Sequence, residues 1–168
     1  MRRKTGGDLD VLVTSHGIQR RHSAEEFPLN EWDDVISVNL SSIFVLCQEA
    51  GKIMLKKGYG KIINVASMNS FFGGQTIPAY AAAKGGVAQL TKELSNDWAG
   101  RGINVNAIAP GYMATEMNEA LLDPKNPRFK TISERIPADA GELRGYAGNS
   151  HFLSLPMQVI ICVEQSFR

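Results

Sequence analysis

Three short apolar runs alternate along the chain with long stretches in which apolar residues recur every three or four positions. The runs lie at Leu9 to Val13, Lys61 to Val65 and Ile103 to Ile108, and each has the length of a buried strand. Helical spacing holds from about Asn30 to Lys57 and from about Ala79 to Ala99, and a glycine follows each stretch. Strands that alternate with long helices predict an α/β fold with a parallel sheet.

Two further segments carry weaker patterns. The stretch that begins at Asn30 fits either one long helix or two abutting ones, and a short helix is expected near Thr115 to Leu122. Gln158 to Val163 is the candidate for one extra strand. No internal repeat, low-complexity segment or linker divides the sequence. The pattern therefore predicts a single domain over residues 1–168, or part of one.

Polar residues gather where the predicted strands end. The loops Thr14 to Arg21, Ala66 to Pro78 and Ala109 to Thr115 each follow a strand, and Ser67 lies just past the end of the second one. Open parallel sheets bind ligands outside the carboxyl ends of their strands. We therefore expect the three loops to converge on one site.

Tyr80 and Lys84 are the residues whose spacing points most directly to chemistry. They stand four positions apart on a predicted helix, so that the phenol and the ammonium project from the same face. A phenol with a pKa of about 10 is a poor base at neutral pH unless a nearby cation stabilises its anion. Lys84 is placed to supply that cation and so to lower the pKa of the phenol. Tyr80 is therefore the candidate acid/base group.

Composition narrows the class of partner. The 168 residues include 43% hydrophobic and 21% charged residues, with a net charge of +1, as in a globular protein without a field that would attract nucleic acid or an anionic membrane. No signal sequence or membrane-length apolar run is present, so we predict a cytoplasmic protein that acts on a small molecule. Cys47 and Cys162 are far apart and predicted to be reduced, and no spacing indicates a metal site.

Four motifs in order carry a family resemblance. They are Asn39 in Val38-Asn39-Leu40, Ser67 in Asn64-Val65-Ala66-Ser67, the Tyr80 to Lys84 box, and Pro110-Gly111 with Thr115. Together they resemble the short-chain dehydrogenase/reductase family over about Leu9 to Pro137. The sequence from Gly17 to His22 resembles that of the sugar-acid branch, in particular fungal 2-deoxy-D-gluconate 3-dehydrogenases and gluconate 5-dehydrogenases. The resemblance implies a Rossmann-like doubly wound sheet.

The resemblance also implies catalytic roles for four residues. Tyr80 would exchange a proton with the substrate oxygen, and Ser67 would hydrogen-bond the same oxygen. Lys84 would lower the pKa of the phenol and hold the nicotinamide ribose, while Asn39 would anchor a water that relays protons. The implied cofactor is NAD or NADP, which donates or accepts the hydride. Its implied binding residues are Gly17, Tyr80, Lys84, Pro110, Gly111 and Thr115.

Other residues are candidates for substrate contact. Arg20 and Arg21 would pair with the carboxylate of a sugar acid, or else form a solvated basic loop, and the two interpretations weigh equally. Gln75 and Met117 are weaker candidates for the pocket lining. His16, which stands where the family keeps a methyl group, is interpreted as a loop residue. By family analogy the two long helices would also build a homo-oligomer.

Both ends of the sequence depart from the family pattern. A family member opens with a strand, a glycine-rich turn and a helix that holds the cofactor pyrophosphate, and Gly6-Gly7 does not match that turn. Residues 138–168 do not align with the family. We therefore expect a partial Rossmann-like sheet of three core strands in a truncated domain, family-like over residues 9–137. Because the residue that distinguishes NAD from NADP lies in the opening half, the choice of cofactor stays open.

Three functions fit this sequence. The first is an NAD(P)-dependent oxidoreductase that interconverts a hydroxyl and a carbonyl on a sugar acid such as 2-deoxy-D-gluconate or gluconate. The second is a catalytically inactive family fragment with at most a role in oligomerisation. The third is a short-chain reductase for another carbonyl substrate.

Overall fold

The computed structural model describes residues 8–111, 125 and 160–163. Four strands form one sheet in the order β1 (Val11–Thr14), β2 (Gly60–Val65), β3 (Ile103–Pro110) and β4 (Ile160–Val163). Every neighbouring pair is parallel, with Val13 opposite Ile63 and Ile63 opposite Asn106. The carboxyl ends of the strands therefore share one edge of the sheet.

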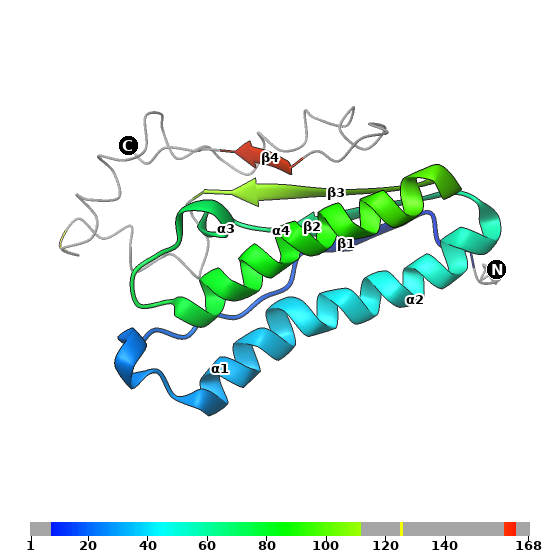
Figure 1. The fold of residues 1–168 in the computed structure, drawn as a ribbon. Helices are drawn as coiled ribbons and strands as arrows, with labels where there is room; N and C mark the ends of the chain where they lie inside the picture. The colour runs from blue at the N-terminus through cyan, green and yellow to red at the C-terminus, as the bar shows by residue number, and fades with distance from the viewer. Residues whose placement is uncertain (1–7, 112–124, 126–159, 164–168) are drawn as a thin grey trace.

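Long helices connect the strands. α1 (Leu29–Ile36), the π-helical segment η2 (Ser37–Ser41) and α2 (Ser42–Lys57) follow one another without a break, and α4 (Pro78–Trp98) connects β2 to β3. Figure 1 shows α2 and α4 along the same face of the sheet. The shorter elements are η1 (Ala24–Glu26), α3 (Asn69–Phe72) and η3 (Ala99–Arg101). None of the helices in the described ranges is long and apolar enough to cross a bilayer.

The hydrophobic core lies between the sheet and these two long helices. Ile43 and Met54 of α2, Val87 of α4, Ile62 of β2 and Val105 of β3 are at most 1% exposed and belong to one cluster. Full burial of an aliphatic side chain stabilises a fold by about 1.5–3 kcal/mol. The apolar spacing of the two helices is thus explained by the sheet that they cover.

The predicted strands and long helices are confirmed, with ends that differ by a few residues. The first helical stretch, predicted as one long helix or two abutting ones, is a continuous helical run in which the π-helical segment η2 joins α1 to α2. β4 confirms the extra strand within Gln158 to Val163. The predicted helix near Thr115 to Leu122 lies outside the described residues. Cys47 is a buried free thiol, as predicted, whereas the side chain of Cys162 is not described.

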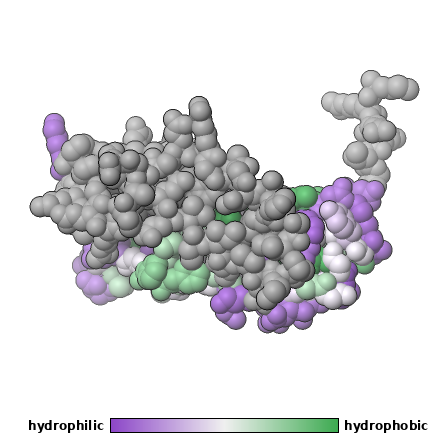
Figure 2. Space-filling view, turned by 90° about the horizontal axis from the view of Figure 1, so that it is seen from above, coloured by the Kyte–Doolittle hydropathy of each residue, from purple (hydrophilic) through white to green (hydrophobic). Residues whose placement is uncertain are grey.

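β1 is buried on one face only. Thr14 is 1% exposed and faces the helices, but Val11 and Val13 are 45% and 53% exposed. The run has the composition of a buried strand, but one of its faces is exposed, because nothing in the described part of the chain covers that face. Exposed apolar side chains of this kind favour association. Figure 2 views the molecule from above and shows hydrophobic residues beside hydrophilic ones on the surface in view.

Candidate active site

A hollow of about 150 Å³ lies at the carboxyl edge of the sheet. Three segments that are distant in sequence build it: the loop after β1, the turn after β2 with the first turns of α4, and the end of β3. Its walls are formed by Ser15, His16, Gly17, Val65, Ala66, Ser67, Tyr80, Lys84, Pro110 and Gly111. The convergence of loops that was predicted from the strand order thus produces one polar pocket.

Ser67 is held by the turn that follows β2. Ala66 N–H donates to the Ile108 carbonyl at 2.8 Å, which ties the start of this turn to β3. The Ser67 Oγ accepts a hydrogen bond from Asn69 N–H at 3.1 Å, and the side chain is nearly buried. Because the oxygen already accepts from the backbone, the hydroxyl proton remains available to donate into the hollow.

Tyr80 and Lys84 come from the first two turns of α4, which begins at Pro78. A proline at the first helical position fixes this start, since its missing N–H has no helical partner to lose. The Lys84 Nζ lies 5.9 Å from the centre of the Tyr80 ring and donates a hydrogen bond to the Val65 carbonyl at 2.6 Å. The two side chains share a face of the helix, but the ammonium is bonded to the end of β2.

The pKa values of both groups follow from burial. Removal from water raises the pKa of the Tyr80 phenol above its usual value, and a hydrogen bond with Ser67 opposes this only in part. Burial lowers the pKa of Lys84 from 10.5 to about 8. The expectation that Lys84 lowers the pKa of Tyr80 is therefore wrong in this structure, because burial dominates and the ammonium is bonded to Val65. Lys84 instead becomes a group that can gain and lose a proton near neutral pH.

Asn39 lies in the π-helical segment and is fully buried. Its Oδ1 accepts from Ile18 N–H and its Nδ2 donates to the Ile18 carbonyl, both at 2.8 Å. A Cβ added at Gly17 would lie 3.3 Å from the Asn39 Oδ1, so the loop approaches the amide closely. Since both ends of the amide bind the loop backbone, a water relay at Asn39 would have to use main-chain groups of this residue.

The other predicted site residues divide into two groups. Gly17, Pro110 and Gly111 line the hollow, whereas Thr115 and Met117 lie outside the described residues. The three remaining candidates, Arg20, Arg21 and Gln75, are not among its lining residues.

Each of those three side chains has its own surroundings. The Arg20 Nε lies 3.8 Å from the Glu31 carboxylate, and the Arg21 guanidinium donates to the Gln19 Oε1 at 2.9 Å. Gln75 is exposed in the loop before α4.

Ser15 and His16 were not assigned a functional role from the sequence. Both line the hollow, and the signal that points to them is their position directly after the first strand. The imidazole of His16 lies beside Ser42 of α2, with Nε2 and Oγ 2.7 Å apart.

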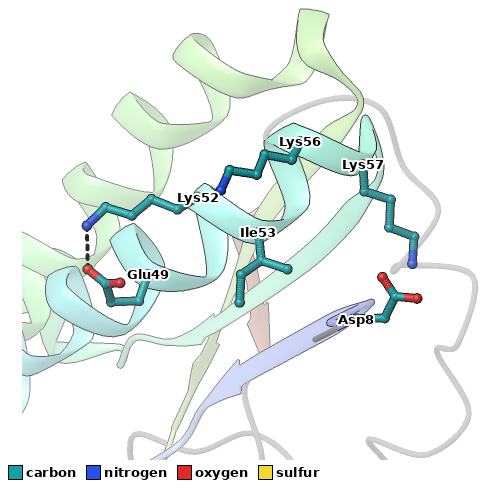
Figure 3. Close-up of a pocket in the computed structure, with 6 residues that line it drawn as sticks. All are labelled: Asp8, Glu49, Lys52, Ile53, Lys56 and Lys57. Carbon is teal, nitrogen blue, oxygen red and sulfur yellow. Dashed lines mark hydrogen bonds and ion pairs between the residues drawn. The ribbon is translucent and has the colours of Figure 1, made fainter. Parts of the chain in front are cut away.

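A second hollow lies at the opposite, amino-terminal edge of β1, and Figure 3 shows its lining. Its charges are largely paired: the Lys52 Nζ donates to the Glu49 carboxylate at 2.6 Å, and Lys57 pairs with Asp10. The lining consists of Asp8, Glu49, Lys52, Ile53, Lys56 and Lys57. None of the residues implicated in chemistry is there. Within the described residues, no group of histidine, cysteine or carboxylate side chains could hold a metal ion.

The donor set of the first hollow fits part of a nicotinamide dinucleotide. The Ser67 and Tyr80 hydroxyls and the Lys84 ammonium are groups that bind sugar hydroxyls, and Gly17 and Gly111 leave the backbone accessible. A volume of about 150 Å³ is below the roughly 300–1,000 Å³ of typical small-molecule pockets. The described residues therefore suit one sugar-sized portion of such a cofactor.

This arrangement defines a Rossmann-like α/β protein with its candidate site at the carboxyl edge of a parallel sheet. The sequence model of short chain dehydrogenases matches residues 2–126. The chain belongs to the short-chain dehydrogenase family.

The names of individual relatives describe enzymes that act on sugar acids. The chain is 48% identical over 147 residues to the 2-dehydro-3-deoxy-D-gluconate 5-dehydrogenase of Bacillus subtilis, covering 87% of this chain and 58% of the relative. It is 48% identical over 150 residues to the 5-keto-D-gluconate 5-reductase of Escherichia coli, covering 88% and 58%. The chain thus spans a little over half the length of the curated relatives that it matches.

A solved structure gives the same picture. A putative 2-deoxy-D-gluconate 3-dehydrogenase from Agrobacterium tumefaciens, solved with bound NADP, is 47% identical and superposes with a TM-score of 0.85. The alignment covers 92% of this chain and 65% of that one.

Proposed function

We propose that the chain acts as an NAD(P)-dependent oxidoreductase that interconverts a hydroxyl and a carbonyl on a sugar acid such as 2-deoxy-D-gluconate or gluconate. The observation that carries this proposal is the meeting of Ser67, Tyr80 and Lys84 in one hollow at the carboxyl edge of the sheet. The names of the relatives support the substrate class.

The proposed mechanism assigns one role to each side chain. Tyr80 gives a proton to the substrate oxygen during reduction, and its raised pKa keeps the phenol protonated at neutral pH. Ser67 donates a hydrogen bond to the same oxygen, since its own oxygen is occupied by Asn69 N–H. Bound NAD or NADP would supply the hydride chemistry. In the reverse direction, Tyr80 must first lose its proton, and its phenolate then takes the proton of the hydroxyl as the hydroxyl is oxidised.

Lys84 would resupply the proton. With a pKa of about 8, it exchanges protons near neutral pH more readily than an exposed lysine does. Its bond to the Val65 carbonyl holds the ammonium at the wall of the hollow, where it would also donate to ribose hydroxyls of the cofactor. Gly17, Pro110, Gly111 and, outside the described residues, Thr115 complete the proposed cofactor contacts. Arg20, Arg21, Gln75 and Met117 remain candidate substrate residues.

The experiment is a turnover assay with a matched tyrosine control. NADH and NADPH oxidation is followed with the keto forms of gluconate and of 2-deoxygluconate, for the wild type, Tyr80→Phe and Tyr59→Phe. Tyr59 is half exposed beside Lys57 of the second hollow, so replacing it tests for general damage. We expect Tyr80→Phe to abolish turnover and Tyr59→Phe to retain it. Equal turnover rates for the wild type and Tyr80→Phe would refute the mechanism.

A role in association without catalysis is the second candidate, and the exposure of Val11 and Val13 favours it. Under that function the wild type binds neither dinucleotide and elutes in gel filtration as an oligomer. The single domain over residues 1–168, the homo-oligomer and the cytoplasmic location also remain part of our proposal. A third candidate, a reductase for another carbonyl substrate, would bind NADPH but turn over neither sugar acid.

A further inference from the structure

His16 lines the hollow and carries an imidazole at a position where the family resemblance predicts only a methyl group. The residue lies in the loop after β1, on the same wall as Ser15 and Gly17, and shares the hollow with Tyr80 and Lys84. The side chain is solvent accessible, so that a ligand in the hollow can reach it. The mechanism above does not use this ring.

The hydrogen bonds around Ser42 determine which ring nitrogen carries a proton. The Ser42 Oγ lies 2.7 Å from the Val38 carbonyl and 2.7 Å from the His16 Nε2. A carbonyl can only accept, so the single hydroxyl proton of Ser42 points to Val38. The Ser42 oxygen must then accept from the ring, which places a proton on Nε2. In the neutral imidazole, Nδ1 is therefore an unprotonated acceptor.

The π-helical segment creates this arrangement. Ser42 N–H donates to the Ser37 carbonyl, one residue beyond its α-helical partner Val38. The Ser42 hydroxyl bonds the Val38 carbonyl in its place. The same segment carries Asn39, which binds both backbone groups of Ile18. The loop after β1 is thus held at two points, at Ile18 by Asn39 and at the ring of His16 by Ser42.

Among the side chains that line the hollow, a neutral His16 offers in Nδ1 an acceptor that carries no proton of its own, whereas the Ser15 hydroxyl can both donate and accept. Lys84 can only donate when charged, and the hydroxyls of Ser67 and Tyr80 are assigned to the substrate oxygen. A sugar hydroxyl binds best where it can both accept and donate, and Nδ1 of a neutral His16 accepts its proton. This chemistry selects a hydroxyl over a phosphate oxygen, which has no proton to give at neutral pH.

We propose that His16 is a cofactor-binding residue whose Nδ1 accepts a hydrogen bond from a ribose hydroxyl of the nicotinamide dinucleotide, with Ser42 as the residue that orients the ring. The inference rests on the proposed function, because it needs a dinucleotide in the hollow. It adds a contact that depends on this side chain and not on the loop backbone.

The test is a calorimetric titration of NADPH, without any sugar acid, into the wild type and four variants. His16→Ala removes the acceptor, and His16→Asn offers a side-chain oxygen close to the position of Nδ1. Ser42→Ala leaves the ring but removes the group that orients it. Lys52→Ala, in the second hollow of Figure 3, is the control for changes in charge and handling. Circular dichroism establishes that each variant keeps its fold.

One neutral hydrogen bond is worth about 0.5–1.5 kcal/mol, so we expect His16→Ala to weaken NADPH binding about three- to ten-fold. His16→Asn should recover part of this loss, Ser42→Ala should weaken binding in the same direction, and Lys52→Ala should match the wild type. If the wild type binds NADPH and the dissociation constants of His16→Ala and Ser42→Ala stay within about two-fold of its value, the role of His16 is overturned. The proposed function would still stand in that case. Absence of NADPH binding by the folded wild type would overturn both.

Discussion

Replacing Lys84 with methionine should change how the stability of the chain depends on pH. Lys84 is 4% exposed, and burial lowers its pKa from 10.5 to about 8. In the unfolded chain the group keeps its ordinary pKa. Folding therefore disfavours the charged form, and this cost is fully present below about pH 8 and is lost as the pH rises toward 10.5. Wild-type stability should accordingly rise with pH in that window, and Lys84→Met should not show the rise.

The expected size follows from the difference between the two pKa values. A tenfold change in proton affinity corresponds to about 1.4 kcal/mol, so the full cost of the buried charge is about 3 kcal/mol. Between about pH 7 and pH 9 only part of this cost is removed, and the wild type should gain about 1 kcal/mol relative to Lys84→Met. The lost hydrogen bond to Val65 also destabilises the variant, but by an amount that does not change with pH.

The assay is urea unfolding of both proteins at steps from about pH 7 to about pH 9. The upper limit avoids Cys47, because burial raises the pKa of its thiol from 9.0 to about 11 and this group destabilises the fold as the pH rises from 9 to 11. Lys52→Met, which removes an exposed lysine of α2, is the matched control and should run parallel to the wild type. Stability differences between wild type and Lys84→Met that stay constant across this range would refute the buried-charge reasoning.

Two further substitutions test the local geometry. Gly102 has a φ of +87°, and an added Cβ would lie 2.0 Å from the Gly58 carbonyl oxygen, so Gly102→Ala should cost about 2 kcal/mol or more in urea unfolding; an unchanged midpoint would contradict this contact. Asn39→Ala removes both bonds to Ile18 and should cost about 2 kcal/mol while raising amide exchange at Ile18; unchanged exchange would mean that other contacts hold the loop.

The strands and long helices could be predicted because their apolar side chains all pack into the same core. β2 and β3 are buried on one face and at least partly buried on the other, and α2 and α4 present one apolar side to the sheet, so each pattern is visible in the sequence. The π-helical segment could not be seen in this way. Its five residues keep helical spacing, and the extra residue shows only in the hydrogen bond from Ser42 N–H to Ser37.

The candidate site shows the same division. The spacing of Tyr80 and Lys84 correctly predicts a shared helix face, and their strand-end neighbours place the pocket. Spacing does not determine where a flexible ammonium is bonded, and here it reaches the Val65 carbonyl. The direction in which the pKa of Tyr80 shifts depends on burial, which is a property of the assembled layers and not of the local sequence. The role expected of Arg20 depends in the same way on Glu31, a residue of the following helix.

The π-helical segment allows the helical run of α1 and α2 to lose one residue without a change in the faces that pack on the core. A single-residue deletion within Ser37–Ser41 would return the turn to ordinary α-helical bonding, with the apolar faces of α1 and α2 still in phase. The same deletion later in α2 would rotate every following side chain by about 100° and carry Met54 out of the core. A lineage could therefore lose the turn that presents Asn39 and Ser42 while retaining a folded protein. Shortening the segment by one residue would therefore disrupt the candidate site before it unfolded the chain.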